Sequence, residues 1–314
     1  MARVLTGLWF GGHGWGQGGW SDPDLTTPLT MHSEYHDFGS KTLVGGFQIA
    51  SRPPTTENAL RDIDDAIRHL FEHPNTGPFI GRQLIQFLVT DNPTPGYVQR
   101  VAAVFADNGS GVRGDLGAVV KAILLDTEAR NSASLSQNPN FGRLKEPVIR
   151  TMAMARAFGM KEVQDLLWWD WSTFYDAARQ EPTRSPSVFN FYRPDHRPPG
   201  VMTQQDLAGP VFQITDSYSA IAFPNHLWSI LEGGFNVWRT YSFPLDLSRE
   251  VALASDPERL VDHLNLMLCA GSMRASTRSI ILSNINAIPA SDRAARARVA
   301  AYLALTAPEG AVMK

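Results

Sequence analysis

The sequence predicts a mainly α-helical protein: a multi-helix array with a small β-hairpin element near the N-terminus and a long proline-rich irregular segment. Three observations predict this class. Apolar residues recur at helical spacing in one segment after another. Short polar turns separate these segments, as in a packed helical array. Prolines recur throughout residues 181–247 and interrupt every long pattern there.

The composition is that of a folded globular protein. The chain has 314 residues, of which 43% are hydrophobic and 19% charged, so disorder is excluded as its main state. A net charge of −3 gives no basic surface for nucleic acid or for an anionic membrane. One cysteine, Cys269, excludes a disulfide framework and a thiolate zinc site. No apolar run reaches the ~18 residues that a membrane span needs.

The chain begins with a short apolar run that gives way to glycine. The run is too short for a signal peptide, and we expect it to be the end of a helix or an entering strand. Because no polar residues lead into it, we expect that an N-terminal part of the protein is missing. Residues 11–20 read GGHGWGQGGW and form a loop, since glycine at this density cannot hold a helix. The loop either presents Trp15 and Trp20 to a ligand or packs both rings against the core.

The regular elements follow in order along the chain. A β-hairpin is expected over residues 43–49, around the Gly45-Gly46 pair. The first helix is expected to begin with Thr56 as its N-cap and to stop at Pro74. Further helices are expected over residues 78–89, 95–105, 115–124, 147–158, 215–231, 257–269, 276–285 and 291–305.

We expect these elements to form a single domain over residues 1–314. Its parts are a glycine-rich loop and β element at 1–55, a helical array at 56–180, a proline-rich wrap at 181–250 and C-terminal helices at 251–314. No internal repeat of fixed period and no low-complexity tail is present.

The densest group of potential metal ligands lies near the hairpin. In an extended segment His32, Glu34 and His36 would project from one face, because side chains alternate along a strand. Imidazole and carboxylate groups suit zinc or a similar divalent metal ion. The alternative is a polar loop in which His36 bonds to the backbone and Asp37 caps a turn.

Three indoles are concentrated in one short stretch, at Trp168, Trp169 and Trp171. On a helix they would spread around the circumference, so at least one ring is expected at the surface. They form either a stacking platform for sugar rings or an interface anchor, or they fill a groove between helices. The sequence has no G-x-S-x-G elbow, no P-loop and no dinucleotide fingerprint.

Several segments together carry a resemblance to a known family. They are ARVLTGLWF, HSEYHDFGSKTLVG, HPNTGPFIGRQLIQFLVTDNP, GDLGAVVKAILLDTEAR, RLKEPVIRTMAMARAFG, RSPSVFNFYRPD, LNLMLCAGSMRASTRSIILSNI and VAAYLALTAPE. The second matches an HD-x-G-x-K block through His36, Asp37, Gly39 and Lys41. In this order the segments resemble the bacterial family named domain of unknown function 1800, over nearly the whole chain.

The resemblance implies a setting for the protein. Members of the family generally start with an export signal and a helical segment, which agrees with the expectation of a missing N-terminal part. They are often found beside a sulfatase-like partner, the family of unknown function 1501. The resemblance therefore implies an extracytoplasmic protein, periplasmic or secreted, with a possible sulfatase-like partner protein.

Two functions are expected from these observations. The first is an extracytoplasmic enzyme acting on a polymer, foremost a polysaccharide hydrolase, with His36, Asp37 and Lys41 as catalytic residues. Its substrate-binding residues would be Trp15, Trp20, Trp168, Trp169 and Trp171. The second is a non-catalytic glycan-binding or envelope assembly protein. On the first hypothesis the three catalytic residues line a concave surface with the glycine-rich loop; otherwise Asp37 and Lys41 pair with each other at the surface.

Overall fold

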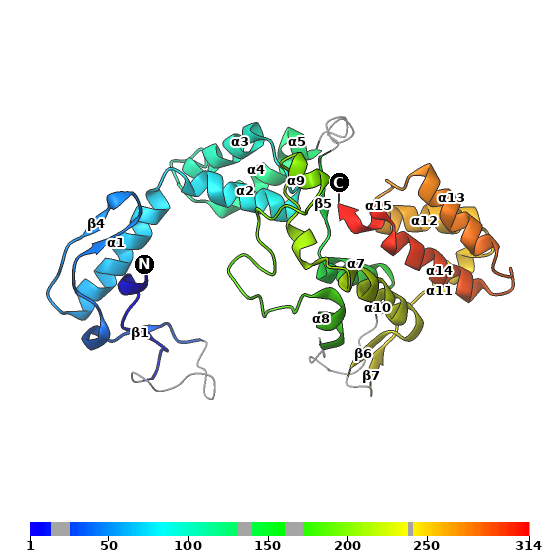
Figure 1. The fold of residues 1–314 in the computed structure, drawn as a ribbon, viewed down its shortest axis with the longest axis horizontal. Helices are drawn as coiled ribbons and strands as arrows, with labels where there is room; N and C mark the ends of the chain where they lie inside the picture. Colours follow the sequence, from blue (N-terminus) through cyan, green and yellow to red (C-terminus); the bar gives the residue numbers. More distant parts are fainter. Residues whose placement is uncertain (14–25, 131–139, 161–171, 238–240, 314) are drawn as a thin grey trace. The chain divides into compact units, whose positions relative to one another are not determined.

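The computed structural model describes residues 1–13, 26–130, 140–160, 172–237 and 241–313 (Figure 1). All five tryptophans predicted to bind substrate lie outside these ranges, namely Trp15, Trp20, Trp168, Trp169 and Trp171. The chain divides into two compact units, residues 1–80 and 81–314. We describe each unit by itself, and the expectation of a single domain stays a prediction.

The first unit combines short strands and 3-10 turns with one long helix (Figure 1). Its elements are η1 (Ala2–Val4), β1 (Leu8–Trp9), β2 (Thr30–Met31), η2 (Ser33–Tyr35), β3 (Lys41–Thr42), η3 (Val44–Gly46), β4 (Gln48–Ile49) and α1 (Thr56–Glu72). β1 pairs antiparallel with β2, and β3 pairs antiparallel with β4. The β3–β4 pair is the predicted hairpin, and its turn uses Gly45 and Gly46, both with positive φ.

Helix α1 begins one residue earlier than the sequence predicts. Its N-cap is Thr55, whose side chain accepts a hydrogen bond from the Asn58 backbone N–H. The buried face differs from the predicted one, because Ala59, Asp62 and Ala66 are buried. The apolar residues that predicted this helix are exposed or only partly buried; they are Leu60, Ile63, Ile67, Leu70 and Phe71. The core of the unit is small and consists of Val4, Leu43, Ile49 and Ala66, with Ile63 packed against them.

The regular elements that the structure describes in the second unit are mainly helices, with two short strand pairs and a long irregular segment among them (Figure 1). Its first half contains α2 (Thr76–Leu88), which crosses the division between the units, α3 (Pro95–Ala106), α4 (Leu116–Leu125), α5 (Thr127–Arg130), β5 (Arg143–Leu144), α7 (Pro147–Ala157) and α8 (Ser172–Ala178). Its second half contains α9 (Val201–Gln204), η4 (Pro210–Ile214), α10 (Ser219–Gly233), β6 (Phe235–Val237), β7 (Tyr241–Phe243), α11 (Ser248–Leu253), α12 (Pro257–Cys269), α13 (Ala275–Asn286), α14 (Arg293–Thr306), α15 (Pro308–Ala311) and β8 (Val312–Met313). The mainly α fold with small two-stranded pairs is confirmed.

Small residues allow the C-terminal helices to pack closely. The buried face of α14 consists largely of alanines, including Ala297, Ala300 and Ala304, and α12 and α13 pack against this helix. Leu264 of α12 and Ile281 of α13 belong to the same core. Within the described residues, no helix combines the length and the apolar character that crossing a membrane requires.

The proline-rich segment has little regular structure before α10, where only the short elements α9 and η4 form. One strand pair connects distant parts of this unit, because β5 pairs antiparallel with β8. Arg143 lies opposite Met313 and Leu144 opposite Val312, so the middle of the chain lies beside residues 312–313.

Candidate functional site

The imidazole of His36 is buried, and both of its nitrogens face oxygen atoms of the protein. Nδ1 lies 2.8 Å from the carbonyl oxygen of Thr6. Nε2 lies 3.3 Å from Oδ2 of Asp62 on α1. The side chain has 0% exposed surface. His36 therefore connects the N-terminal segment to α1, and its ring is not presented to a ligand from outside.

Lys41 is directed to the same carboxylate. Its Nζ donates to Oδ2 of Asp62 at 2.5 Å and to the carbonyl oxygen of Gly39 at 3.1 Å. Nη1 of Arg52 lies 2.9 Å from Oδ1 of Asp62, as an ion pair without hydrogen-bond alignment. One fully buried carboxylate thus faces two cations and a histidine. Such a cluster holds segments together, because removing any partner leaves a buried charge uncompensated.

Asp37 lies at the surface and pairs with Arg3. Nε and Nη2 of Arg3 donate to its two oxygens at 2.5 Å and 3.0 Å. These hydrogen bonds, with one from the Gly39 backbone, hold the pKa of the Asp37 carboxyl well below its usual range. Asp37 therefore pairs with Arg3 and Lys41 with Asp62, and Asp37 and Lys41 do not pair with each other. Two of the segments that carry the family resemblance, ARVLTGLWF and HSEYHDFGSKTLVG, contact each other here.

The three residues expected to bind a metal do not share a face. The segment is not extended as predicted, because Ser33–Tyr35 form the 3-10 helix η2. Nδ1 of His32 lies 3.7 Å from Oε1 of Glu34, whereas His36 faces Thr6 and Asp62. In the part of the chain that the structure describes, no group of three or more His, Cys, Asp or Glu side chains could hold a metal ion. The expected divalent metal therefore has no ligand set in these residues.

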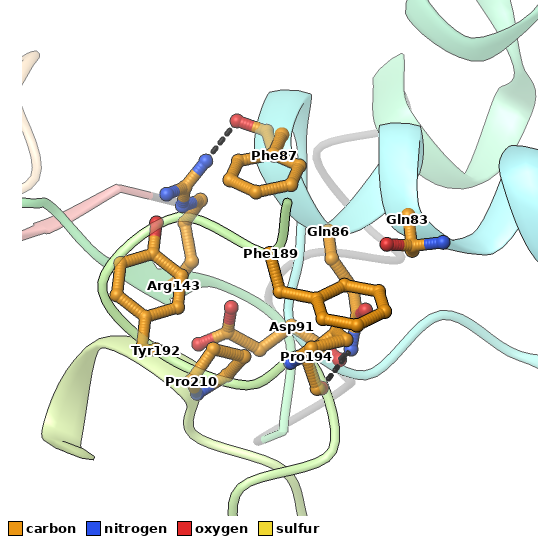
Figure 2. A pocket seen from close by; sticks show the side chains of 9 residues that line it. All are labelled: Gln83, Gln86, Phe87, Asp91, Arg143, Phe189, Tyr192, Pro194 and Pro210. Carbon is orange, nitrogen blue, oxygen red and sulfur yellow. Dashed lines mark hydrogen bonds between the residues drawn. The ribbon is translucent and has the colours of Figure 1, made fainter. Parts of the chain in front are cut away.

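A pocket in the second unit brings together three segments far apart in sequence (Figure 2). It is lined by Gln83, Gln86, Phe87, Asp91, Arg143, Phe189, Tyr192, Pro194 and Pro210. The pocket has about 290 Å³ of empty space, part of it open to solvent. The space within it that can hold the centre of a water molecule is about 10 Å³, which is room for about one water.

Hydrogen bonds between the segments fix the shape of this pocket. Nε2 of Gln86 donates to the carbonyl oxygens of Asp91 and Pro194, at 2.9 Å and 3.0 Å. The Asp91 backbone N–H donates to the carbonyl oxygen of Gly142 at 3.1 Å. The end of α2, the approach to β5 and the irregular segment are therefore held to one another by hydrogen bonds to backbone carbonyl oxygens.

The carboxyl group of Asp91 is the chemically unusual group of the pocket. The residue is only 5% exposed. Burial raises the pKa of Asp91 to about 7, and the charge of Arg143 and the Leu144 backbone oppose this shift only in part. Both protonation states of Asp91 are thus accessible near neutral pH. The Tyr192 hydroxyl lies on the Arg143 side of the pocket (Figure 2); it is buried and has no well-aligned hydrogen bond within the described residues.

A second buried carboxylate, that of Glu146, holds Arg143 in place. It accepts hydrogen bonds from Gln180 at 2.5 Å, from Asn190 at 3.1 Å and from Nη2 of Arg143 at 3.3 Å. Nη1 of Arg143 donates to the carbonyl oxygen of Phe87, as Figure 2 shows. Burial, followed by the charge of Glu146, raises the pKa of Tyr192. The pocket therefore rests on a network of buried ionisable groups.

None of these residues stands out in the sequence as part of a site. Asp91 follows the helix expected over residues 78–89, and Phe189 lies in RSPSVFNFYRPD, one of the segments of the family resemblance. The available signal was that three resembling segments supply every lining residue except Pro210: HPNTGPFIGRQLIQFLVTDNP, RLKEPVIRTMAMARAFG and RSPSVFNFYRPD. That they meet is visible only in the folded chain.

Comparison with known proteins supports the resemblance. The model of the family described as "Protein of unknown function (DUF1800)" matches residues 1–312 of the chain. The match does not bear out the expectation that an N-terminal part is missing. No curated protein and no solved structure matches the chain.

Proposed function

This chain belongs to the DUF1800 family, and we propose that it is a hydrolase acting on a polymer, with polysaccharide as the substrate class, at the pocket of Asp91. One observation carries the proposal: a buried carboxyl group, with its pKa raised to about 7, lies in a pocket rimmed by aromatic side chains. An acid/base group is most effective when its pKa lies near the working pH.

The rim of the pocket has the chemistry that recognises sugars. Phe87 and Phe189 are 37% and 36% exposed, so their rings are accessible to the apolar face of a sugar. Gln83 adds an amide that can bond to hydroxyl groups. Because both rings lie at the mouth and Asp91 lies deeper, a bound chain would rest on the rim and direct one linkage inward.

The groups inside the pocket have separate roles in this proposal. Protonated Asp91 gives its proton to the linkage oxygen as the bond from that oxygen to the sugar carbon breaks. Water, for which the pocket has room, adds to this carbon, and the proton that the water loses restores the carboxyl group. Arg143 and Tyr192 are positioning residues in this proposal. Arg143 is itself held in place by Glu146 and by the carbonyl oxygen of Phe87. His36, Asp37 and Lys41 act on the stability of the first unit and not on the reaction.

The test compares two carboxylate variants of the full chain on a panel of polysaccharides, by release of reducing ends. Asp91→Asn is expected to lower hydrolysis about 100-fold or more, and to remove an inflection near pH 7 from the activity profile. Asp206→Asn, which changes an exposed carboxylate, is the matched control and leaves hydrolysis unchanged. Hydrolysis that persists in a folded Asp91→Asn variant contradicts the proposal.

A further variant separates this site from the one expected from the sequence. Asp37→Asn removes the exposed pair with Arg3 and is expected to leave hydrolysis unchanged. Loss of hydrolysis in Asp37→Asn, with the folded structure retained, would return the reaction to the first unit.

The second candidate is a non-catalytic glycan-binding or envelope assembly protein. The observation that favours it is that His36, Asp37 and Lys41 are all held by Asp62, Arg3 and neighbouring groups of the protein. On this candidate the wild type binds a glycan of the panel without cleaving it, and Phe189→Ala weakens the binding. An extracytoplasmic location and a sulfatase-like partner rest on the family resemblance alone; fractionation of cells producing the protein tests the first.

A further inference from the structure

A second cavity of the 81–314 unit is separate from the pocket of Asp91, and the two share no lining residue. It has about 720 Å³ of empty space, part of it open to solvent, which is in the range of small-molecule sites. Its walls come from the start of α7, the end of η4, the first half of α10 and the region around α15.

Two cations, Lys145 and Arg150, are the only charged residues among the described residues that line this cavity. Neither has a carboxylate within 4 Å in the described ranges of the chain. Burial lowers the pKa of Arg150 to about 10, and burial and then the positive charge of Arg150 lower the pKa of Lys145. The interaction of Lys145 with Cys269 opposes this lowering of its pKa in part, and among the described residues no carboxylate contacts either cation.

Backbone carbonyl oxygens accept only some of the hydrogen bonds that Arg150 and Lys145 can donate. Nη2 of Arg150 donates to the carbonyl oxygen of Leu305 at 2.8 Å, at the end of α14. Nζ of Lys145 donates to the carbonyl oxygens of Gly310 at 3.1 Å and Leu268 at 3.4 Å. These are helix C-termini, whose partial negative charge balances the cations in part. Nε of Arg150 is buried and makes no hydrogen bond within the described residues.

The remainder of the lining is largely apolar. The guanidinium of Arg150 lies over the Phe223 ring, 5.0 Å from its centre, and Phe223 also lines the cavity. Val211, Ile214 and Pro224 extend this apolar surface. The hydroxyls of Thr215 and Thr306 donate to backbone carbonyls of their own segments. A ligand would therefore meet positive charge at one part of the cavity and apolar surface elsewhere.

We propose that this cavity binds an amphiphilic oxyanion, a small molecule whose apolar body ends in a carboxylate or phosphate group. The oxyanion receives hydrogen bonds from Arg150 and Lys145, and the apolar body packs against η4 and α10. Carboxylate and phosphate groups match the planar donor edge of a guanidinium, and binding supplies the missing counter-charge. The inference does not depend on the reaction proposed for Asp91.

The test uses calorimetric titration of the full chain with octanoate, octyl phosphate and octan-1-ol. Octanoate or octyl phosphate is expected to bind with one-to-one stoichiometry and octan-1-ol at least tenfold more weakly; the two anions show which head group is preferred. Arg150→Gln and Lys145→Gln each raise Kd about 10- to 100-fold, the range for losing a charged hydrogen bond. Arg156→Gln removes an exposed charge from α7 and leaves Kd unchanged.

A variant that removes no charge tests the cavity independently, in case the charge variants do not fold. Ala220 is exposed on α10 and lines the cavity, so Ala220→Trp fills the cavity without replacing either cation and abolishes binding. Circular dichroism confirms that each variant is folded. The proposal is overturned if neither anion binds the wild type, if octan-1-ol binds as well as octanoate, or if folded Arg150→Gln and Ala220→Trp bind like the wild type.

Discussion

Replacing Asp62 by alanine tests whether the buried charge cluster holds the first unit together. The Asp62 side chain has 0% exposure and faces Lys41, which is 3% exposed, together with His36 and Arg52. Asp62→Ala leaves these groups without their counter-charge and opens a space between α1 and the hairpin. Breaking a buried pair from one side costs about 3–5 kcal/mol. That is a large part of the ~5–15 kcal/mol that stabilises a typical domain.

The assay must report on the first unit alone, because the two units need not unfold together. Hydrogen exchange of the intact protein, read by mass spectrometry on peptides from α1 and the β3–β4 hairpin, gives the local free energy of opening. The control is Asp64→Ala, which removes an exposed carboxylate from the same helix. It is expected to change the local free energy of opening by less than ~0.5 kcal/mol. A loss below ~1 kcal/mol in Asp62→Ala, or a loss equal to that of the control, would refute the reasoning.

Three further predictions concern stability. The pKa of Asp91 rises from 3.8 to about 7 on folding, so between these values the folded state binds a proton that the unfolded state has lost. The free energy of unfolding of the wild type, relative to that of Asp91→Asn, therefore falls as pH rises from 4 to 7. Equal pH dependence of Tm for the two proteins would contradict this. A Cβ at Gly310 would overlap the Ala304 carbonyl oxygen, so Gly310→Ala is expected to cost about 1–3 kcal/mol in denaturant unfolding, and an unchanged midpoint would refute the overlap. Thr55→Ala removes the N-cap of α1. It is expected to lower the local free energy of opening of α1, measured by hydrogen exchange, by about 1 kcal/mol and to leave that of α12 unchanged.

Local signals in the sequence were enough to predict most helices. The segment expected over residues 257–269 has the bounds of α12, because the apolar spacing that predicts it continues to Cys269. The segment expected over residues 95–105 also agrees with α3, except that it ends one residue early. Caps, prolines and periodicity act over a few residues, so the sequence alone contains this information.

Burial and the candidate site depended on contacts that periodicity does not contain. The spacing of Leu60 and Ile67 predicts the buried face of α1, whereas the structure buries Asp62, because Lys41 and Arg52 reach it from other segments. The alternation of His32 and Glu34 assumes an extended segment, which the η2 turn replaces. The Asp91 pocket needs Arg143 and Tyr192 from distant parts of the chain, and no local pattern predicts that they meet.

The pairing of β5 with β8 has a consequence for how the protein is made. A chain leaves the ribosome from its N-terminus, so Arg143 and Leu144 emerge long before Val312 and Met313, their partners in the strand pair. The helices around them can form as they emerge, but the edge of β5 stays open until residues 312–313 have been synthesised. The strand contact beside Arg143 can therefore form only after residues 312–313 have left the ribosome, later than the helices that lie between the two strands.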